Sequence, residues 1–516
     1  MALKPRFAAR SEPTAKTSVM TAIICGLLFL GWVGEWPLEI DPVMYLGKWR
    51  SAFGALAPMF APVPGISLFP WQILLFASVP FCLSRSGVRR HAREMDRAIF
   101  ISIACIAATF LWGWLHGGAP YFAYYQVWRF LAALLIAYML MSAMHSERDL
   151  VTLGKIVVLA ALIRATLCIY FFWTYVRGKI FPAPEFVTNH DDSMLWVVAI
   201  LIVATWAALK RARIAWLVAA LVVPFLAYAM VVNTRRLAWV ELGLAMPVLY
   251  FLIGPGPVRS RINKWLLRAA PILVVYVVAG LGSDGAVFAP VHALATTGSN
   301  YDPSSLTRQE EARNLLHTLV DIGNPLFGTG WGRPYDKVES YWSNYNVEWV
   351  LVLYTPHNAI LGLAAFAGLL GIMGIWGVVP TAAYLAARGY GGSTSAVPRG
   401  AAMVALGTLA AYSVHCYGDI GLQSFQVSLI FGAALATAGK VAVWGEARQS
   451  SEALSAAQKV TAQAGGGRPA PEPQPAYRLA RAPWRRREPA APRPAPSGAK
   501  GAAVRPNRAP KPRLSR

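Results

Sequence analysis

The sequence predicts an all-α membrane protein with about twelve transmembrane helices, and three observations lead to this prediction. Hydrophobic residues make up 56% of the 516-residue chain and charged residues only 14%, whereas soluble proteins carry about 25% charged residues. Apolar runs of about 20 residues, which is the length that crosses a bilayer, recur along the chain. The runs are continuously apolar and lack the alternation of barrel strands, so we expect helices.

The expected spans divide the chain into three parts. Residues 1–18 form a cytoplasmic N-terminal segment, residues 19–444 a polytopic membrane domain, and residues 445–516 a tail. A large periplasmic loop, residues 283–355, is expected between helices nine and ten. The twelve spans are residues 19–34, 66–83, 98–116, 126–144, 151–173, 193–209, 214–232, 237–254, 265–282, 356–384, 400–417 and 421–443.

The tail, residues 445–516, holds 15 basic and 4 acidic residues and is rich in Pro, Ala, Gly and Arg. Such a composition cannot bury enough apolar surface to offset the entropy of ordering, so the tail is expected to be disordered. Its positive charge favours weak attraction to anionic lipids of the cytoplasmic leaflet. A nucleic-acid partner is not expected.

The orientation follows from Lys and Arg residues, which concentrate in cytoplasmic loops. The N-terminus and every second connection hold 20 basic residues, whereas the short connections on the other side hold 6 and residues 283–355 hold 4. Both termini are therefore expected in the cytoplasm. Residues 283–355 are expected outside, which in a bacterium is the periplasm.

Two arginines stand on the side that cations avoid. Arg235 and Arg236 are adjacent in the tight turn NTRR between spans seven and eight. They either reach phospholipid head groups or clamp a phosphate or pyrophosphate, since guanidinium groups match phosphate oxygens in pairs. Glu241, further into span eight, is a candidate partner for one of them.

Arg164 is predicted near the middle of the bilayer, where a charge is costly and faces a cavity or a partner. With Arg129, at the outer end of span four, it suggests a cationic cavity that opens outward. An ion pair between Arg164 and Glu241 would explain a charge at this depth equally well.

Residues 283–355 contain a predicted amphipathic helix. Thr307 and Glu310 form a potential capping box, and Gly323-Asn324-Pro325 is a stop signal. At 100° per residue Arg308 shares the apolar face and should point toward the membrane, whereas Arg313 is rotated off that face. The apolar positions are Ala312, Leu315, Leu316, Leu319 and Val320.

The next segment begins a helix with Thr355 as a potential N-cap, Pro356 at the first position and His357 in the first turn. The positive end of the helix dipole disfavours the imidazolium form, and a neutral imidazole can act as a general base. Asn358 could orient His357 or serve as a donor. A capping or surface role for His357 is the structural alternative.

A further polar group, His190 with Asp191 and Asp192, occupies the short outer loop before span six. These residues are candidates for contacts with sugar hydroxyls, and His190 for a second base. They are equally compatible with a plain loop.

Three motifs together resemble the O-antigen ligase and polysaccharide polymerase family of bacterial inner membranes. They are NTRRLAWVELGLA in span eight, NPLFGTGWG in the outer segment and PHNAILGLAAFAGLLG at the start of span ten. The resemblance covers roughly residues 190–385. It implies transfer of a glycan from undecaprenyl pyrophosphate at the periplasmic face, without a metal or a cofactor.

The resemblance also implies roles for single residues. The family's arginine between spans seven and eight matches Arg236 or Arg235, and its histidine matches His357 as the catalytic base. Its loop arginine matches Arg308, although the spacing to Pro325 is longer than expected, which leaves Arg313 as an alternative. The substrate-binding candidates are thus Arg235, Arg236, Arg308, Asn358, His190, Asp191 and Arg164.

The acceptor stays open at this point. A ligase would use lipid A core, a polymerase another glycan, and an O-linked glycosyltransferase a protein. The alternative of another class is a secondary transporter or a lipid-linked glycan flippase. Transporters commonly bind at the midplane, where Arg164 is the one strong charge expected here.

Overall fold

The computed structural model describes most of the expected membrane domain. The described residues are 17–34, 60–63, 66–68, 70–80, 92–178, 186–210, 212–283, 286–288, 290–291, 295, 303–338, 353–422 and 424–464. The expected N-terminal segment, up to residue 16, and the end of the tail, 465–516, lie outside them.

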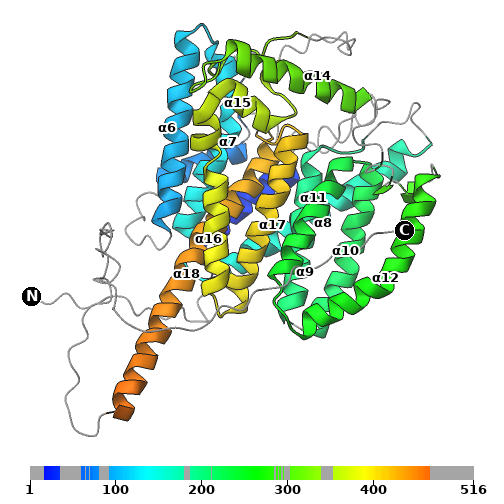
Figure 1. Cartoon of the computed structure of the whole chain (residues 1–516), viewed down its shortest axis with the longest axis vertical. Coiled ribbons are helices and arrows are strands. Elements are labelled where there is room, and N and C mark those ends of the chain that lie inside the picture. The colour runs from blue at the N-terminus through cyan, green and yellow to red at the C-terminus, as the bar shows by residue number, and fades with distance from the viewer. Residues whose placement is uncertain are drawn as a thin grey trace, which may run out of the picture. The chain divides into compact units, whose positions relative to one another are not determined.

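A helical bundle forms the centre of the protein (Figure 1). α17 (Ala396–Gly418) packs against α9 (Asp191–Lys210), α11 (Arg236–Leu252) and α16 (Val378–Gly392). α9 also packs against α8 (Glu147–Phe171), α10 (Arg213–Asn233) and α11. The side chains of α9, including Trp196, are therefore mostly buried.

The local sequence explains where these helices begin. α6 (Arg93–Leu115) carries Glu94 and Asp96 in its first turn, where carboxylates complement the helix dipole. α7 (Pro120–Ala143) has proline at its first position, which needs no N–H partner. α8 (Glu147–Phe171) has a capping box of Ser146 and Asp149 and continues as the π-helix η2 (Phe172–Val176).

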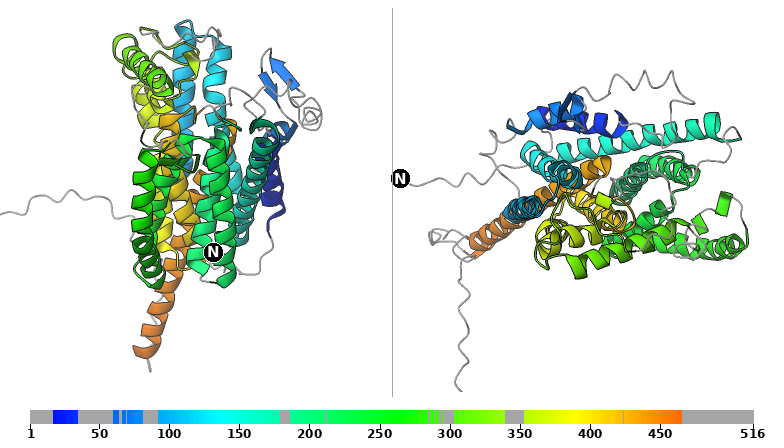
Figure 2. Two further views of the ribbon diagram at one scale, coloured as in Figure 1. Left: turned by 90° about the vertical axis from the view of Figure 1, so that its right-hand side faces the viewer. Right: turned by 90° about the horizontal axis from the view of Figure 1, so that it is seen from above.

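The N-terminal part differs from the expectation. α1 (Val19–Gly34) matches the first expected span, but the second expected span, 66–83, is a helix only in part. β1 (Phe60–Val63) and β2 (Ile66–Leu68) form an antiparallel hairpin, drawn in blue in Figure 2, and α4 (Pro70–Ala77) follows. Pro70 sets the helix start because proline at a first helical position cannot continue a helix backward.

Eight helices among the described residues are long and apolar enough to cross a membrane. They correspond to α6, α7, α8 with η2, α9, α10, α12 (Pro257–Leu281), α15 (Ala359–Leu369) to α16, and the first half of α18 (Phe425–Ala464). Helices also occur at the four remaining expected positions, as α1, α4, α11 and α17. The chain is thus a multi-helix membrane protein, and the count of twelve stays a prediction.

α18 (Phe425–Ala464) runs into the segment that was expected to be a disordered tail from residue 445. Residues 446–464 of that segment, EARQSSEALSAAQKVTAQA, contain neither proline nor glycine and are rich in helix-forming Ala, Glu, Gln and Lys. Local propensity therefore continues the helix until Ala464, where the Gly-Gly-Gly and proline-rich sequence begins.

A broken helix lies at the predicted tenth span. α15 (Ala359–Leu369) ends at a kink where Gly368 has φ 55°, and the π-helix η6 (Leu370–Ile375) and α16 (Val378–Gly392) follow. A loop, Asn324–Gly332, supplies the hydrogen bonds that the kink leaves open. Leu369 N donates to Pro325 O at 2.9 Å, and Thr329 N and Gly330 N donate to Ala365 O and Phe366 O, both at 2.9 Å.

The same loop is held from its other side by α6 and α7. Trp331 Nε1 donates to Thr109 Oγ1 at 2.7 Å, and Gly332 N donates to Gln126 Oε1 at 2.7 Å. Gly330 has φ 86°, and a Cβ there would collide with the backbone of Gly113. The NPLFGTGWG motif is therefore a structural wedge between α6, α7 and the broken helix.

α14 (Pro303–His317) with the π-helix η4 (Thr318–Ile322) lies at one end of the bundle, next to α15 (Figure 1). Its end before Gly323 confirms the predicted stop signal. Its start was predicted wrongly, since the helix begins at Pro303 and Thr307 lies inside it. Proline at the first position takes the place of the expected capping box.

Candidate active site

His357 is held by a buried carboxylate. Its Nδ1 lies 2.8 Å from Oε2 of Glu311, and Asn358 N donates to Oε1 of the same carboxylate at 3.2 Å. The Glu311 side chain is 5% exposed and that of His357 36% exposed. An ionised carboxylate only accepts hydrogen bonds, so Nδ1 carries the proton and Nε2 becomes the acceptor.

The helix after His357 begins later than predicted. α15 starts at Ala359 with Asn358 as its N-cap, because Asn358 Oδ1 accepts from Leu361 N at 3.0 Å. Thr355 is therefore not the N-cap, and His357 lies just before the helix instead of in its first turn. An asparagine at this position satisfies a backbone N–H that has no partner within the helix.

The buried side of α14 is polar, contrary to the predicted apolar face. Leu316 and Val320 are 52% and 69% exposed, and Arg308 and Arg313 are both exposed. Only part of the expected face therefore points into the bundle, with Leu315 buried and Ala312 and Leu319 half-buried. Polar side chains are buried on α14 because they form hydrogen bonds with other segments. For example, Asn314 Oδ1 accepts from the backbone N–H of Val338 at 3.0 Å. The residues buried on this side are Glu310, Glu311, Asn314, Leu315 and Thr318.

The turn with Arg235 and Arg236 closes α10 and opens α11. Thr234 has a left-handed φ of 55°, Arg235 is the N-cap and Arg236 the first residue of α11. Arg235 is 95% buried, since its exposed fraction is 5%, and its guanidinium carbon lies 3.2 Å from the ring centre of Phe186. Arg236 is half-buried.

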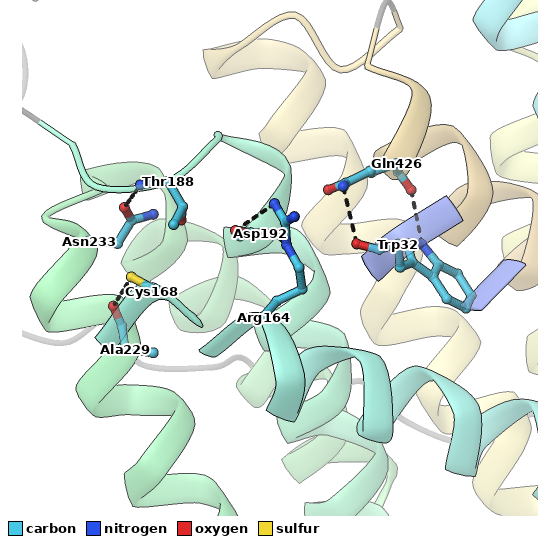
Figure 3. Close-up of polar contacts among 8 residues, drawn as sticks. All are labelled: Trp32, Arg164, Cys168, Thr188, Asp192, Ala229, Asn233 and Gln426. Atoms are coloured by element: carbon cyan, nitrogen blue, oxygen red, sulfur yellow. Dashed lines mark hydrogen bonds and ion pairs between the residues drawn. The ribbon is translucent and has the colours of Figure 1, made fainter. Parts of the chain in front are cut away.

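Asn233 fastens this turn to the loop before α9. Its Oδ1 accepts from Val187 N at 3.1 Å and from Thr188 N at 2.8 Å (Figure 3). Asn233 and Thr188 are both completely buried. The loop that carries His190 is therefore fixed against the turn that carries the two arginines.

His190 faces Asp419, a residue that the sequence argument missed. Nδ1 of His190 lies 2.6 Å from Oδ2 of Asp419, which is 3% exposed and ends α17 in the connection to α18. Burial alone would raise the pKa of Asp419. The neighbouring charge and the hydrogen bond of His190, with a further contribution from His415, outweigh burial and hold the pKa of Asp419 well below its usual range. Asp419 is thus the carboxylate that pairs with His190 at the end of α17.

Arg164 pairs with Asp192 instead of Glu241. Its Nε and Nη2 donate to the two carboxylate oxygens at 2.6 and 3.0 Å, and both side chains are completely buried (Figure 3). Asp192 belongs to the first turn of α9, beside the half-buried Asp191. The pair therefore anchors the first turn of α9 to α8.

Glu241 pairs with His415, a second contact that the sequence argument missed. Oε1 of Glu241 in α11 lies 2.6 Å from Nδ1 of His415 in α17, and neither side chain is exposed. The other polar atoms of the pair, Oε2 and Nε2, are buried without a hydrogen-bond partner among the described residues. The pair lies one helical turn from Asp419, whose N donates to His415 O at 2.8 Å.

The part of the chain that the structure describes holds no group of three or more His, Cys, Asp or Glu side chains suited to a metal ion.

Residues 223–376 match the family model of the O-antigen ligase, a range that contains Arg235, Arg236, Arg308, Glu311 and His357. No curated protein matches the chain. Asp419, His190 and Arg164 lie outside the matched range. Residues 223–376 of this membrane protein are thus similar to the O-antigen ligase family.

Proposed function

We propose that the chain transfers a glycan from undecaprenyl pyrophosphate to an acceptor hydroxyl at the periplasmic face of a bacterial inner membrane. The family match supports lipid-linked glycan transfer in general. A chain of contacts supports the finer proposal. Arg235 stacks on Phe186, whose ring lies 6.1 Å from that of His190, and His190 pairs with Asp419.

His357 acts as the general base in this proposal. Glu311 keeps the proton on Nδ1, so Nε2 takes the proton of the acceptor hydroxyl. The acceptor oxygen forms a bond to the anomeric carbon, and the bond from that carbon to the pyrophosphate oxygen breaks. The electron pair leaves with the lipid pyrophosphate.

The arginines stabilise the charge that appears on the leaving pyrophosphate. Arg235 and Arg236 stand at the start of α11, where the helix dipole also favours an anion. On α14, Arg308 lies one turn before Glu311, about 60° around the helix, whereas Arg313 is about 160° away. Arg308 therefore lies on nearly the same side of α14 as Glu311, and this favours Arg308 as the third arginine.

The remaining candidates contact the sugars or support those that do. His190 and Asp191 stand at the start of α9, and we assign them to sugar hydroxyls. Arg164 is completely buried with Asp192, so its proposed role is to fix the start of α9 and thereby His190 and Asp191. Asn358 keeps its amide at the helix start, one residue after His357.

A transporter or flippase is the alternative class, and a broken membrane helix is a feature of transporters. In this chain the backbone groups freed at Gly368 are bound by Pro325, Leu326, Thr329 and Gly330. The break is thus filled by protein and favours neither transport nor a midplane site.

A reconstituted assay tests the proposal. The purified protein receives an undecaprenyl-pyrophosphate-linked glycan together with lipid A core, a protein acceptor or only more donor. We expect one of these to yield a new glycosidic product and free lipid pyrophosphate, in the presence of EDTA as well. Movement of intact donor across the vesicle membrane without any product would contradict the transfer reaction and favour a flippase.

A further inference from the structure

A cavity lies where α11 ends and α12 begins, at the end of α11 opposite to Arg235 and Arg236. It is separate from the candidate active site. α12 (Pro257–Leu281) begins a few residues after α11 ends at Leu252. Its first turns line a cavity of about 430 Å³. The lining residues that bear on the argument are Gly256, Arg259, Ser260, Asn263, Lys264 and Leu267.

The cavity offers cations and hydrogen-bond donors but no carboxylate. Arg259 and Lys264 contribute two positive charges, and no acidic residue occurs in the sequence between Glu241 and Asp284. Neither cation forms an ion pair within the described part of the chain. The start of α12 adds the positive end of a 25-residue helix. Together these groups favour an anion.

Tyr250 of α11 fixes two of the lining residues in place. Its hydroxyl donates to Oδ1 of Asn263 at 2.8 Å, and the guanidinium of Arg259 lies 4.7 Å from its ring centre. Because Oδ1 accepts from Tyr250, the amide of Asn263 has its two N–H donors for another group. The lining residues come from α12 and the loop before it, and Tyr250 of α11 holds the Asn263 and Arg259 side chains in position.

The cavity borders an apolar surface that the described part of the protein leaves exposed. Only 6% of the apolar part of α12 is buried, and Trp265, Leu266 and Leu267 are 64%, 58% and 78% exposed. Cations that border exposed apolar side chains at a helix end match the boundary between head groups and acyl chains. A phosphate bound there would lie within reach of acyl chains packed on Leu267.

We propose that this cavity binds the phosphate of an anionic phospholipid, with Arg259, Lys264 and Asn263 on the head group and the acyl chains along Leu267. The chemistry of recognition is that of a phosphate anion. The exposed apolar side chains beside the cavity, Trp265, Leu266 and Leu267, favour a lipid phosphate over a soluble phosphate. The site is independent of the glycan-transfer reaction and of the basic tail.

The test compares two double variants with the same loss of charge. Arg259→Gln with Lys264→Gln removes the cations that line the cavity. The control, Arg261→Gln with Arg268→Gln, removes two positive charges from the same helix, at positions roughly 110 to 130° around the helix from the residues that line the cavity. The purified full chain is titrated with short-chain phosphatidylglycerol, phosphatidylcholine and inorganic phosphate, and bound molecules are counted by native mass spectrometry.

We expect wild type and the Arg261, Arg268 variant to bind one phosphatidylglycerol tightly, and the Arg259, Lys264 variant to bind it about tenfold more weakly. Equal weakening in both double variants, or equal binding of phosphatidylcholine, would overturn the site. Competition by inorganic phosphate at the same concentration as the lipid would overturn the lipid assignment and identify a soluble anion.

A single variant covers the case in which the cavity double variant does not fold. Asn263→Leu keeps both charges but removes the amide donors, so we expect phosphatidylglycerol to bind several-fold more weakly. Tyr276→Phe in the same helix, whose hydroxyl contacts Val287 O far from the cavity, is the control. Wild-type affinity of the Asn263→Leu protein would overturn the proposal.

Discussion

Glu311 and His357 lie 46 positions apart in the chain, yet their side chains meet at 2.8 Å. One carboxylate holds both the imidazole and the backbone N–H of the next residue, so it sets the ring's position and its tautomer together. His357 is thus the proposed base and Glu311 the residue that orients it, and the two roles can be tested by separate substitutions.

His357→Ala should lower glycan transfer by ~10² to 10⁴ while donor binding is largely kept, because only the proposed base is removed. Glu311→Gln should lower kcat by a smaller factor and alter its pH profile, because an amide does not hold the same tautomer. The double variant should be no slower than His357→Ala alone. Fully multiplicative losses, measured on folded protein, would mean that Glu311 does not act through His357.

Arg236→Lys should weaken donor binding, because lysine keeps the charge but loses the planar pair of donors that matches a pyrophosphate. Arg308→Ala should behave similarly, and Arg313→Ala is the matched control on the same helix. Binding of the lipid-linked donor and initial rates are the measurements. A larger loss for Arg313→Ala than for Arg308→Ala would assign the third arginine to Arg313.

Asp419→Asn should destabilise the protein at neutral pH by on the order of 1 kcal/mol, since His190 loses its charged partner but is partly exposed. The pKa of Asp419 is lowered from 3.8 in the folded state, so its ionised form stabilises the fold above that value. The stabilisation is lost as the pH falls through the folded-state pKa. Thermal unfolding should therefore show a gap between variant and wild type at about pH 5 that narrows below about pH 4. A gap that widens below about pH 4 would refute this role.

Gly330→Ala should destabilise the protein strongly, by roughly 2 kcal/mol or more, because the new Cβ meets the backbone of Gly113 and φ is 86°. Gly243→Ala in α11 is the control, since a Cβ there meets nothing within 4 Å. Yield and unfolding temperature in detergent are the readouts. Equal stability of the two variants would show that the wedge is not tightly packed.

The topology prediction is tested by cysteine labelling with a membrane-impermeant reagent. Ser299→Cys should react in intact spheroplasts, and Ser450→Cys only after permeabilisation. Cys25, Cys168 and Cys416 are free and buried, so they add little background. Opposite labelling at either position would place the candidate site on the cytoplasmic side.

Much of the fold could be predicted because apolar length and turn residues act locally. The helices from α6 to α12, the turn at Arg235 and the stop before Gly323 all follow from such signals. The face of α14 could not be predicted in the same way. Apolar periodicity assumes that a helix buries its apolar side, whereas Asn314 and Glu311 are buried because distant backbone and His357 bind them.

The pairs within the candidate site were missed because their members are far apart in sequence. Glu241 and His415 nevertheless carry a usable signal. Each is a polar residue inside a predicted span, and such residues seek partners because hydrocarbon offers none. Assigning Arg164 to Glu241 overlooked Asp192, whose place at the start of α9 suggested a loop residue.

The wedge formed by Asn324–Gly332 limits how this protein could be recombined with its relatives. Since its backbone completes the helix at Gly368 and its tryptophan bonds to Thr109, the segment 283–355 is not an exchangeable module. A chimera that imports this segment to change the acceptor must also import the α6 surface around Thr109 and Gly113 and the kinked start of the α15 span. Evolution of a new specificity is thus confined to α14 and its connections, or must alter three separate regions at once.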